Sequence, residues 1–274
     1  MIHPSKVLAS LDARALKSLG QNFLVSQSSL VGLEKYFDIQ KPVLEIGPGL
    51  GAITEYLINK NFRVIAVEKD TKWATYLKEL FKDSLSVMNN DFLELPSAFF
   101  KDHKITQIMG NLPFYITSDI IVKVLGEPNV DIFVMGIQKE VGERLLQERG
   151  NSLALFVKAH GDIVEHRAVS KNNFFPVPEV NAMWLIWKRN KKIENMPMFE
   201  IFLRGVFWGK RKNLYSVLTK NPFFRDVGET RKWDKNIMQM QADLSRLRGD
   251  QLSFEEIKDV FMRLTGEKPL VEGA

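Results

Sequence analysis

Short runs of β-forming residues alternate with longer helical patterns along the first two thirds of this chain. Amphipathic stretches such as Lys72–Phe81 and Ser118–Leu125 lie between the runs. Strands that alternate with helices favour a parallel sheet with helices on both faces. Two later runs are expected to complete the same sheet. In chain order the seven runs are Val43–Ile46, Val64–Val67, Leu85–Met88, Ile105–Met109, Asp131–Ile137, Ile163–Val169 and Ala182–Trp187.

The last third of the chain has helical spacing only. The polar segment Lys188–Pro197 resembles a linker, and the apolar residues after it recur at intervals of three and four. Ser253 with Glu256 three residues later forms a capping box, and Gly266 ends the helix that the box opens. The sequence therefore predicts an α/β domain over residues 1–190 and a small all-helical domain over residues 191–274.

Composition limits the class of protein. A chain of 274 residues with 45% hydrophobic residues can bury a sizeable core. It contains no cysteine, which excludes disulfides and thiolate metal sites and fits a reducing cytoplasm. No apolar run approaches the ~20 residues that span a bilayer, and the first residues lack the apolar centre of a signal peptide. We expect a cytoplasmic protein with no membrane partner and no metal.

The positive charge is concentrated in the last third. Residues 191–274 hold 16 Lys and Arg against 12 Asp and Glu, whereas residues 1–190 hold 22 against 21. A basic excess confined to one part of a chain is typical of contact with phosphate groups. Taken alone, the same excess is equally compatible with a protein that has no polyanionic partner.

A glycine-rich turn follows the first predicted strand. Val43–Gly51 reads as a buried strand that enters the turn directly, with Gly47 and Gly49 at its centre. Glycine lets the backbone pass close to a ligand, and in a doubly wound sheet this turn lies at the ligand-binding edge. The G-x-G-x-G spacing without a following Lys-Ser or Lys-Thr pair disfavours an NTPase phosphate loop.

Two acidic residues end the next two strands. Glu68 lies about 20 residues after the glycines, where a carboxylate can accept both hydroxyls of a ribose. Asp91 is placed to accept from the adenine amino group of a nucleoside cofactor. The plainer interpretation makes both residues ordinary helix caps. Glu68 does not by itself distinguish NAD from S-adenosylmethionine.

A loop suited to an aromatic amine follows the fourth strand. In Gly110–Phe114, the Asn111 side-chain oxygen and a carbonyl of the Leu112–Pro113 backbone can accept the two N–H bonds of an exocyclic amine. Phe114 offers a stacking face worth ~1–3 kcal/mol per base. Methyl transfer to such a nitrogen needs orientation more than acid–base help, so no general base is expected. The plainer interpretation is a proline turn with a core phenylalanine.

These motifs together resemble the ribosomal RNA adenine N6,N6-dimethyltransferase family. The resemblance runs over nearly the whole chain in seven ordered blocks. The blocks are Lys17–Leu24, Val43–Thr54, Val67-Glu68 with Asn90-Asp91, Asn111–Thr117, Gln138–Leu145, Phe175–Val180 and Phe207–Leu214. The sequence departs from the family where Phe114 replaces a frequent Tyr and Tyr115 a frequent Asn. The resemblance implies a Rossmann-like S-adenosylmethionine methyltransferase sheet and S-adenosylmethionine as cofactor.

The resemblance also implies roles for individual residues. Phe175 would form the second wall of the base pocket, opposite Phe114. The residues that would contact the cofactor are Asn22, Leu24, Gly47, Gly49, Glu68, Asp91 and Asn111.

Basic side chains in the later part of the chain are candidates for phosphate contacts. The run Lys210-Arg211-Lys212 lies on a predicted helix with Phe207 and Trp208. Its plainer interpretation is a solvated helix face. The other candidates are Arg144, Arg246 and Arg248.

The form of the opening block, Lys17–Leu24, is closer to the small-subunit branch of the family. The resemblance then implies dimethylation of two adjacent adenosines near the 3′ end of small-subunit ribosomal RNA during ribosome maturation, and we expect a monomer. Two alternatives stay open: a large-subunit methyltransferase of the macrolide-resistance type, and an assembly factor acting mainly by binding. A small-molecule methyltransferase is disfavoured by the basic helical last third. A dehydrogenase is disfavoured because no residue resembles its proton donor.

Overall fold

The computed structural model describes residues 2–16, 20–209, 212–221, 224 and 233–267. The chain divides into two compact units. The first contains Met1–Gly142 and Ile163–Arg189, and the second contains Glu143–Asp162 and Asn190–Ala274. The sequence predicted one division at residue 190, and the segment Glu143–Asp162 differs from it because it groups with the helices of the second unit.

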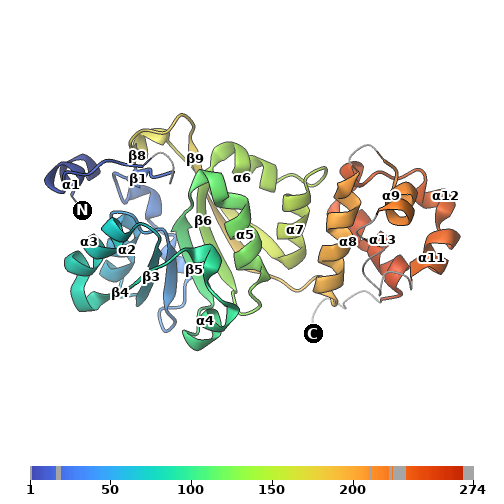
Figure 1. The fold of residues 1–274 in the computed structure, drawn as a ribbon, viewed down its shortest axis with the longest axis horizontal. Coiled ribbons are helices and arrows are strands. Elements are labelled where there is room, and N and C mark those ends of the chain that lie inside the picture. The colour runs from blue at the N-terminus through green and yellow to red at the C-terminus, as the bar shows by residue number, and fades with distance from the viewer. Residues whose placement is uncertain (1, 17–19, 210–211, 222–223, 225–232, 268–274) are drawn as a thin grey trace. The chain divides into compact units, whose positions relative to one another are not determined.

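A seven-stranded sheet forms the centre of the first unit (Figure 1), and it contains every strand that the sequence predicted. Five neighbouring strands are parallel, and β9 runs antiparallel to β6. In spatial order the strands are β4 (Leu85–Asn89), β3 (Val64–Glu68), β2 (Val43–Ile46), β5 (Gln107–Asn111), β6 (Ile132–Gln138), β9 (Ala182–Arg189) and β7 (Gly161–Val169).

The central strands are buried along their length. Every residue of β2 and β3 is buried, as expected for parallel strands covered on both faces. Helix α3 shows the matching helical pattern, since it buries Trp73, Ala74 and Leu77 and begins at Asp70, whose side chain accepts a hydrogen bond from the Lys72 N–H. The helices of this unit are α1 (Pro4–Ser10), α2 (Ala52–Asn59), α3 (Thr71–Phe81), α4 (Ser97–Asp102), α5 (Thr117–Gly126) and α6 (Lys139–Leu145), whose last residues belong to the second unit.

Two distant segments pair beside the main sheet. Strand β1 (Phe23–Leu24) runs antiparallel to β8 (Phe174–Phe175), with Phe23 opposite Phe175 (Figure 1). Phe23 also packs edge-on against Trp73 of α3, with ring centroids 5.6 Å apart. These contacts hold the segment before β2 against the end of the sheet where the strands β2 and β3 finish.

The second unit is helical, as predicted. Aromatic rings of α8 and α13 form its core, where the Phe199 and Phe261 centroids lie 5.1 Å apart. The capping box at Ser253 and Glu256 is confirmed, as is the left-handed Gly266 that ends α13. The helices are α7 (Ser152–His160), α8 (Met196–Trp208), α9 (Leu214–Lys220), α11 (Asp234–Gln239), α12 (Gln241–Leu244) and α13 (Phe254–Thr265). Among the described residues, short 3-10 helices occur in both units. In the first unit they are η2 (Ser28–Leu30), η3 (Glu34–Tyr36), η4 (Lys82–Ser84), η5 (Phe92–Glu94), η6 (Phe114–Ile116) and η7 (Lys171–Asn173), and in the second unit η9 (Gly249–Gln251).

The linker is shorter than the sequence predicted. Strand β9 includes Lys188 and Arg189, and α8 already begins at Met196. The Arg189 guanidinium donates hydrogen bonds to the main-chain carbonyls of Leu125, Glu127 and Val130. Arg189, which the sequence placed in the predicted linker, therefore anchors the end of β9.

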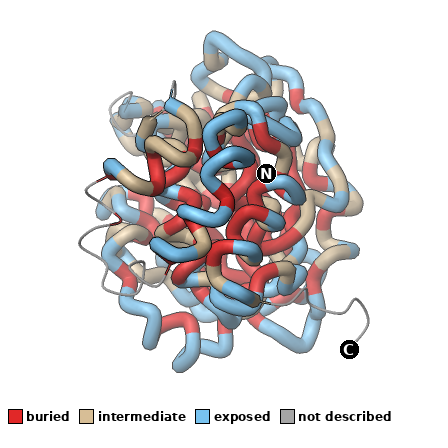
Figure 2. The backbone as a smooth tube through the Cα atoms, turned by 90° about the vertical axis from the view of Figure 1, so that its right-hand side faces the viewer, coloured by how far each residue is buried: buried red, intermediate tan, exposed pale blue. Residues whose placement is uncertain are grey.

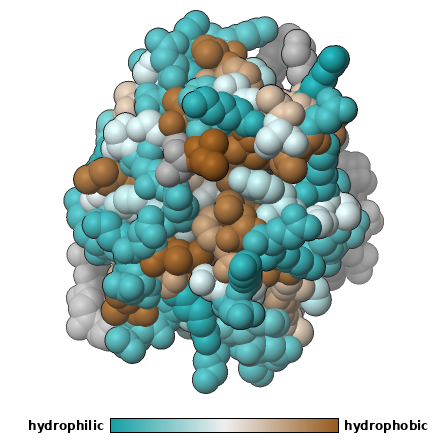
Figure 3. Space-filling model, turned by 90° about the vertical axis from the view of Figure 1, so that its left-hand side faces the viewer, coloured by the Kyte–Doolittle hydropathy of each residue, from teal (hydrophilic) through white to brown (hydrophobic). Residues whose placement is uncertain are grey.

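The surface is that of an ordinary folded domain. Buried and exposed stretches alternate along the helices in Figure 2, as amphipathic helices require. On the face that Figure 3 shows, small apolar patches are separated by hydrophilic side chains. Among the helices described, none combines the length and the apolar character needed to cross a lipid bilayer.

Candidate cofactor and acceptor site

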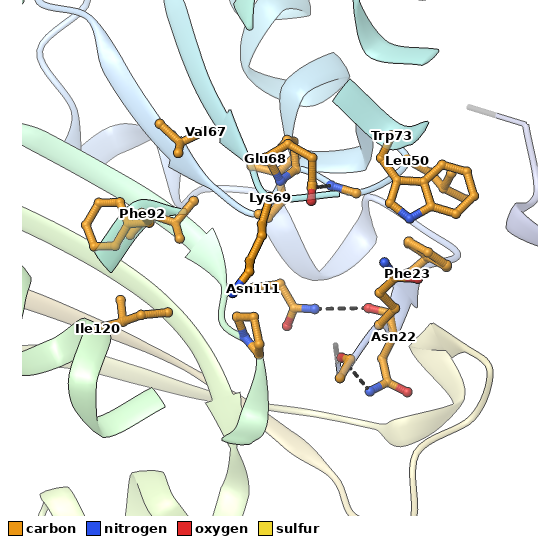
Figure 4. A pocket seen from close by; sticks show the side chains of 18 of the residues that line it. Asn22, Phe23, Leu50, Val67, Glu68, Lys69, Trp73, Phe92, Asn111 and Ile120 are labelled. Atoms are coloured by element: carbon orange, nitrogen blue, oxygen red, sulfur yellow. Dashed lines mark hydrogen bonds between the residues drawn. The ribbon is translucent and has the colours of Figure 1, made fainter. Parts of the chain in front are cut away.

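One pocket in the first unit gathers the residues that follow several of the parallel strands (Figure 4). About 910 Å³ of empty space lies within it, including the open solvent at its mouth. All seven residues predicted to bind a cofactor line it. They are Asn22, Leu24, Gly47, Gly49, Glu68, Asp91 and Asn111.

The glycine-rich turn forms one wall of this pocket. Gly47 and Gly49 have φ values of 61° and 55°, which side chains with a Cβ rarely adopt. A Cβ on Gly47 would point into open space, with no atom within 4 Å, so the backbone there faces the pocket. A Cβ on Gly49 would lie 3.0 Å from the Phe23 ring. Glycine is therefore needed both for the turn and for the close approach of β1.

Glu68 holds the glycine-rich turn to the end of β3. One carboxylate oxygen accepts a hydrogen bond from the Gly49 N–H at 3.0 Å, and the other accepts from the Asp70 N–H at 2.8 Å. Burial raises the pKa of Glu68, while these two main-chain hydrogen bonds oppose the rise. The residue that caps α3 is Asp70, so the plainer interpretation of Glu68 as that cap is wrong.

Asp91 combines a structural contact with a place in the pocket. Its Oδ1 accepts from the Leu93 N–H at 2.9 Å, so it caps η5 as the plainer interpretation expects. Its Oδ2 lies 2.7 Å from the Lys69 ammonium, which also lines the pocket. Burial raises the pKa of Asp91, but the hydrogen bonds from Lys69 and Leu93 outweigh burial and leave this pKa below its ordinary value.

Asn111, the last residue of β5, lines the pocket and has a buried side-chain oxygen. The Asn111 Nδ2 donates to the main-chain oxygen of Asn22 at 3.1 Å, which fixes the orientation of the amide because that oxygen can only accept. The Asn111 Oδ1 is buried and has no hydrogen-bond partner among the residues described. A buried acceptor left unpaired is costly, so it marks a place where a ligand donor is missing.

Hydrogen bonds at both ends hold the loop that follows β5 in place. The Leu112 N–H donates to the Gly136 carbonyl of β6 at 2.8 Å. The Pro113 carbonyl accepts from the Ile116 N–H and from the Thr117 hydroxyl, at 3.2 and 3.0 Å. The orientation of Asn111 is therefore set before any ligand arrives, as orientation-dependent catalysis requires.

The aromatic residues of the predicted base pocket lie in different places. Phe114 lines a second pocket, which shares Gly20, Gln21, Asn22 and Tyr115 with the first. Phe175 is half-buried, packs at the edge of the cluster formed by Leu8, Phe23 and Trp73, and lines neither pocket. The structure thus places Phe114 in the second pocket, and both its contact with a base and its pairing with Phe175 stay predictions.

The residues that line the first pocket fit S-adenosylmethionine. Glu68 and Asp91 are acceptors suited to ribose hydroxyls and an adenine amine, and the glycine backbone leaves room beside them. Apolar side chains form the remaining wall and can cover an adenine ring. They are Ile46, Leu50, Ile53, Val67, Trp73, Phe92 and Ile120.

A buried carboxyl lies beneath the glycine-rich turn. Glu45 of β2 is fully buried (0% exposed), and its Oε2 accepts a hydrogen bond from the Thr54 hydroxyl of α2 at 2.6 Å. Its Oε1 has no partner among the described residues. Burial raises the pKa of Glu45 from 4.5 to about 8, so the neutral acid links β2 to α2 across the turn at neutral pH.

Replacing Glu45 with Gln should remove a pH dependence of stability. Between pH 4.5 and about 8 the folded chain keeps a proton on Glu45 that the unfolded chain releases, so the free energy of unfolding falls as pH rises through this range. The full effect amounts to a few kcal/mol. We expect the melting temperature of Glu45→Gln, relative to the wild type, to rise steadily from pH 5 to pH 8. A difference in melting temperature between Glu45→Gln and the wild type that stays constant from pH 5 to pH 8 would contradict the raised pKa of Glu45.

The predicted phosphate contacts map to the second unit. Arg144 and Lys212 are exposed, and the Lys212 ammonium lies 4.6 Å from the centre of the Trp208 ring. Arg248 forms an ion pair of 2.7 Å with Asp250, and Arg246 is exposed nearby in the sequence. Lys210 and Arg211 lie outside the described residues.

Sequence patterns missed two features of the site. Lys69 lies in the pocket directly after Glu68, and its position at a strand end was the available signal. Gln21 links the segment before β1 to α3, because its side-chain amide donates to Asp70 at 2.9 Å. No local sequence pattern predicts the contact between Gln21 and Asp70, because the two residues lie 49 positions apart.

Comparison with known families supports the same interpretation. A family model described as "Ribosomal RNA adenine dimethylase" matches residues 13–251. Relatives with the name "Ribosomal RNA small subunit methyltransferase A" include proteins from Malacoplasma penetrans and Latilactobacillus sakei. The one from Malacoplasma penetrans is 32% identical over 217 residues, which cover 76% of this chain and 79% of the relative. The one from Latilactobacillus sakei is 32% identical over 272 residues, covering 92% and 90%.

Solved structures share the fold. A dimethyladenosine transferase from Plasmodium falciparum superposes with a TM-score of 0.71 at 20% identity, covering 89% of this chain and 98% of its own. The 23S rRNA methyltransferase ErmE superposes with a TM-score of 0.63 at 23% identity, covering 89% and 99%. Both bear out the predicted Rossmann-like sheet with a helical region after it. With the family model matching most of the chain, this protein belongs to the ribosomal RNA adenine dimethylase family.

Proposed function

We propose that this methyltransferase uses S-adenosylmethionine to dimethylate the N6 amino groups of two adjacent adenosines near the 3′ end of small-subunit ribosomal RNA, on an immature subunit. The observation that carries the chemistry is Asn111, which lines a pocket together with Glu68 and Asp91 and whose buried Oδ1 has no partner among the described residues. The relatives named for the small subunit support that substrate over the large subunit.

The acceptor loop would act by orienting a weak nucleophile. The lone pair of an adenine amine is delocalised into the ring, which makes the nitrogen unreactive. Hydrogen bonds from its two N–H groups to the Asn111 Oδ1 and the Leu112 carbonyl would favour a pyramidal nitrogen with a directed lone pair. Bound S-adenosylmethionine supplies an electrophilic methyl group on a positively charged sulfur. With the amine held by Asn111 and Leu112, its nitrogen would take the methyl group, the carbon–sulfur electron pair would stay on sulfur, and the nitrogen would then lose a proton to solvent.

The second pocket would receive the base. It adjoins the cofactor pocket through Asn22 and Tyr115, and Phe114 offers a ring on its wall. Each target adenosine must leave its stack to enter, at a cost of a few kcal/mol that is smallest where the RNA is already unpaired.

Methyl transfer to isolated subunits tests the proposed function. Undermethylated small and large subunits are incubated separately with labelled S-adenosylmethionine, and the modified positions are mapped by primer-extension stops. We expect two adjacent stops near the 3′ end of small-subunit RNA. A stop in large-subunit RNA alone would identify that RNA as the substrate instead. No stop in either RNA, with the cofactor bound, would favour an assembly factor.

We propose that exposed basic residues of the second unit contact RNA phosphates. Arg144→Glu and Lys212→Glu should each weaken binding to the small-subunit RNA and flatten its dependence on salt, because each removes a contact that releases counterions. The control is Lys101→Glu on α4, an exposed lysine of the first unit with the same change of charge. Binding is measured across a salt series, and an unchanged slope for both variants would contradict the proposal.

We also propose that the chain acts as a monomer in the cytoplasm. The absence of cysteine supports a reducing compartment. Light scattering of the purified chain tests the monomer, since a mass twice the 31.5 kDa of one chain would contradict it.

A further inference from the structure

Lys69 is a charged residue inside the pocket that no part of the proposed mechanism uses. Figure 4 shows its side chain extending from the end of β3 into the pocket. Its ammonium lies 2.7 Å from the Asp91 Oδ2, while about half of the side chain stays exposed (55%). Exposed ion pairs of this kind add little to folding stability, so a contribution to folding does not account for this one.

The contacts of Asp91 show what the ion pair does locally. The Leu93 N–H holds Oδ1 and the Lys69 ammonium holds Oδ2, so the carboxylate is fixed at both oxygens. Each oxygen of a carboxylate has a second lone pair and can still accept from a ligand. Lys69 therefore orients the Asp91 carboxylate and leaves it able to accept a hydrogen bond from a ligand.

The charges around the pair act in the same direction. The hydrogen bond with Asp91 raises the pKa of Lys69, and the nearby Glu94 and Tyr115 raise it further. The same hydrogen bond lowers the pKa of Asp91 against the effect of burial. Glu68, the other carboxylate of the pocket, forms its hydrogen bonds with main-chain N–H groups instead. Asp91 thus relies on the Lys69 side chain, and Glu68 does not.

We infer that Lys69 is a positioning residue of the cofactor site, which holds the Asp91 carboxylate aligned to accept from the adenine amino group. The inference rests on the proposed function only in taking Asp91 as the adenine acceptor. It does not depend on which RNA is methylated. The ligand that reports on it is S-adenosylhomocysteine, which carries the same adenosine and needs no RNA.

A double-mutant cycle on cofactor binding tests the inference. Binding of S-adenosylhomocysteine is measured by calorimetry for the wild type, Lys69→Met, Asp91→Asn and the double variant. We expect Lys69→Met to weaken binding about fivefold, as for a half-exposed charge-assisted hydrogen bond, and to have no effect once Asp91 is Asn. Lys69→Arg should restore most of the affinity, and Lys78→Met, on the exposed side of α3, should change nothing.

The pH profile supplies a readout that a merely structural role would leave unchanged. Without the Lys69 ammonium, only the hydrogen bond from the Leu93 N–H opposes the effect of burial on Asp91, so the pKa of Asp91 rises and the loss of binding at low pH should begin at a higher pH in Lys69→Met. Raising salt from about 0.05 M to about 0.5 M should weaken wild-type binding toward that of Lys69→Met.

An equal effect of Lys69→Met in both Asp91 backgrounds, or an unmoved pH profile, would overturn the inference. Failure of methyl transfer to small subunits with this coupling intact would count against the proposed function instead. The two failures are therefore distinguishable.

Discussion

Replacing Asn111 with Ala should lower the rate of methyl transfer about 10²- to 10³-fold, the scale seen when one preorganised polar group is removed from an active site. The reason is geometric. The variant loses the buried Oδ1 that would accept from the amine, and it also loses the hydrogen bond from Nδ2 to Asn22 that fixes the loop. Single-turnover transfer to undermethylated small subunits measures the effect.

The control is Asn172→Ala, an exposed residue of η7, which should transfer methyl groups at the wild-type rate. Binding of S-adenosylhomocysteine to Asn111→Ala is measured in parallel. A loss of binding as large as the loss of rate would make Asn111 a cofactor residue alone and contradict its role toward the acceptor. Complementation gives a second readout, because a pure assembly factor should still rescue growth as Asn111→Ala.

Replacing Glu68 with Ala should weaken cofactor binding about 100-fold or more. The change removes the proposed ribose acceptor, and it also leaves the Gly49 and Asp70 N–H groups without their partner. Each such unpaired N–H costs ~1–3 kcal/mol where it stays away from water, so the turn itself should loosen. Calorimetry with S-adenosylhomocysteine measures the affinity.

Glu68→Gln separates the two contributions. Its amide keeps one acceptor oxygen but places an NH₂ group opposite a main-chain donor, so we expect an intermediate affinity and a lower melting temperature. Glu79→Gln on the exposed side of α3 makes the same chemical change away from the pocket and should alter neither property. Wild-type affinity in Glu68→Ala would remove this residue from the cofactor site.

Local sequence was sufficient for the sheet and for most of the cofactor pocket. Runs such as Val64–Val67, and Val43–Ile46 apart from Glu45, are apolar because parallel strands are buried on both faces, so the hydrophobic pattern alone identifies them. The carboxyl ends of parallel strands meet at one edge. Residues at or directly after the ends of different strands, such as Glu68 and Gly47, therefore converge in a way that can be predicted without the long-range contacts.

The acceptor side was only partly predictable. The order Asn-Leu-Pro-Phe indicated an amine site, yet the orientation of Asn111 depends on Asn22, a residue 89 positions away. The same limit applies to Phe175, whose place is set by the pairing of β8 with β1 and by the cluster around Trp73.

The sequence by itself determined where the strands occur along the chain, the glycine-rich turn, and the acidic residues at the strand ends. These features depend on neighbours a few residues apart. Tertiary structure alone decided that Lys69 pairs with Asp91, that Asn22 orients Asn111 and that Glu143–Asp162 groups with the helices. Each of those contacts joins residues many positions apart, and its stability comes from packing that no local pattern encodes.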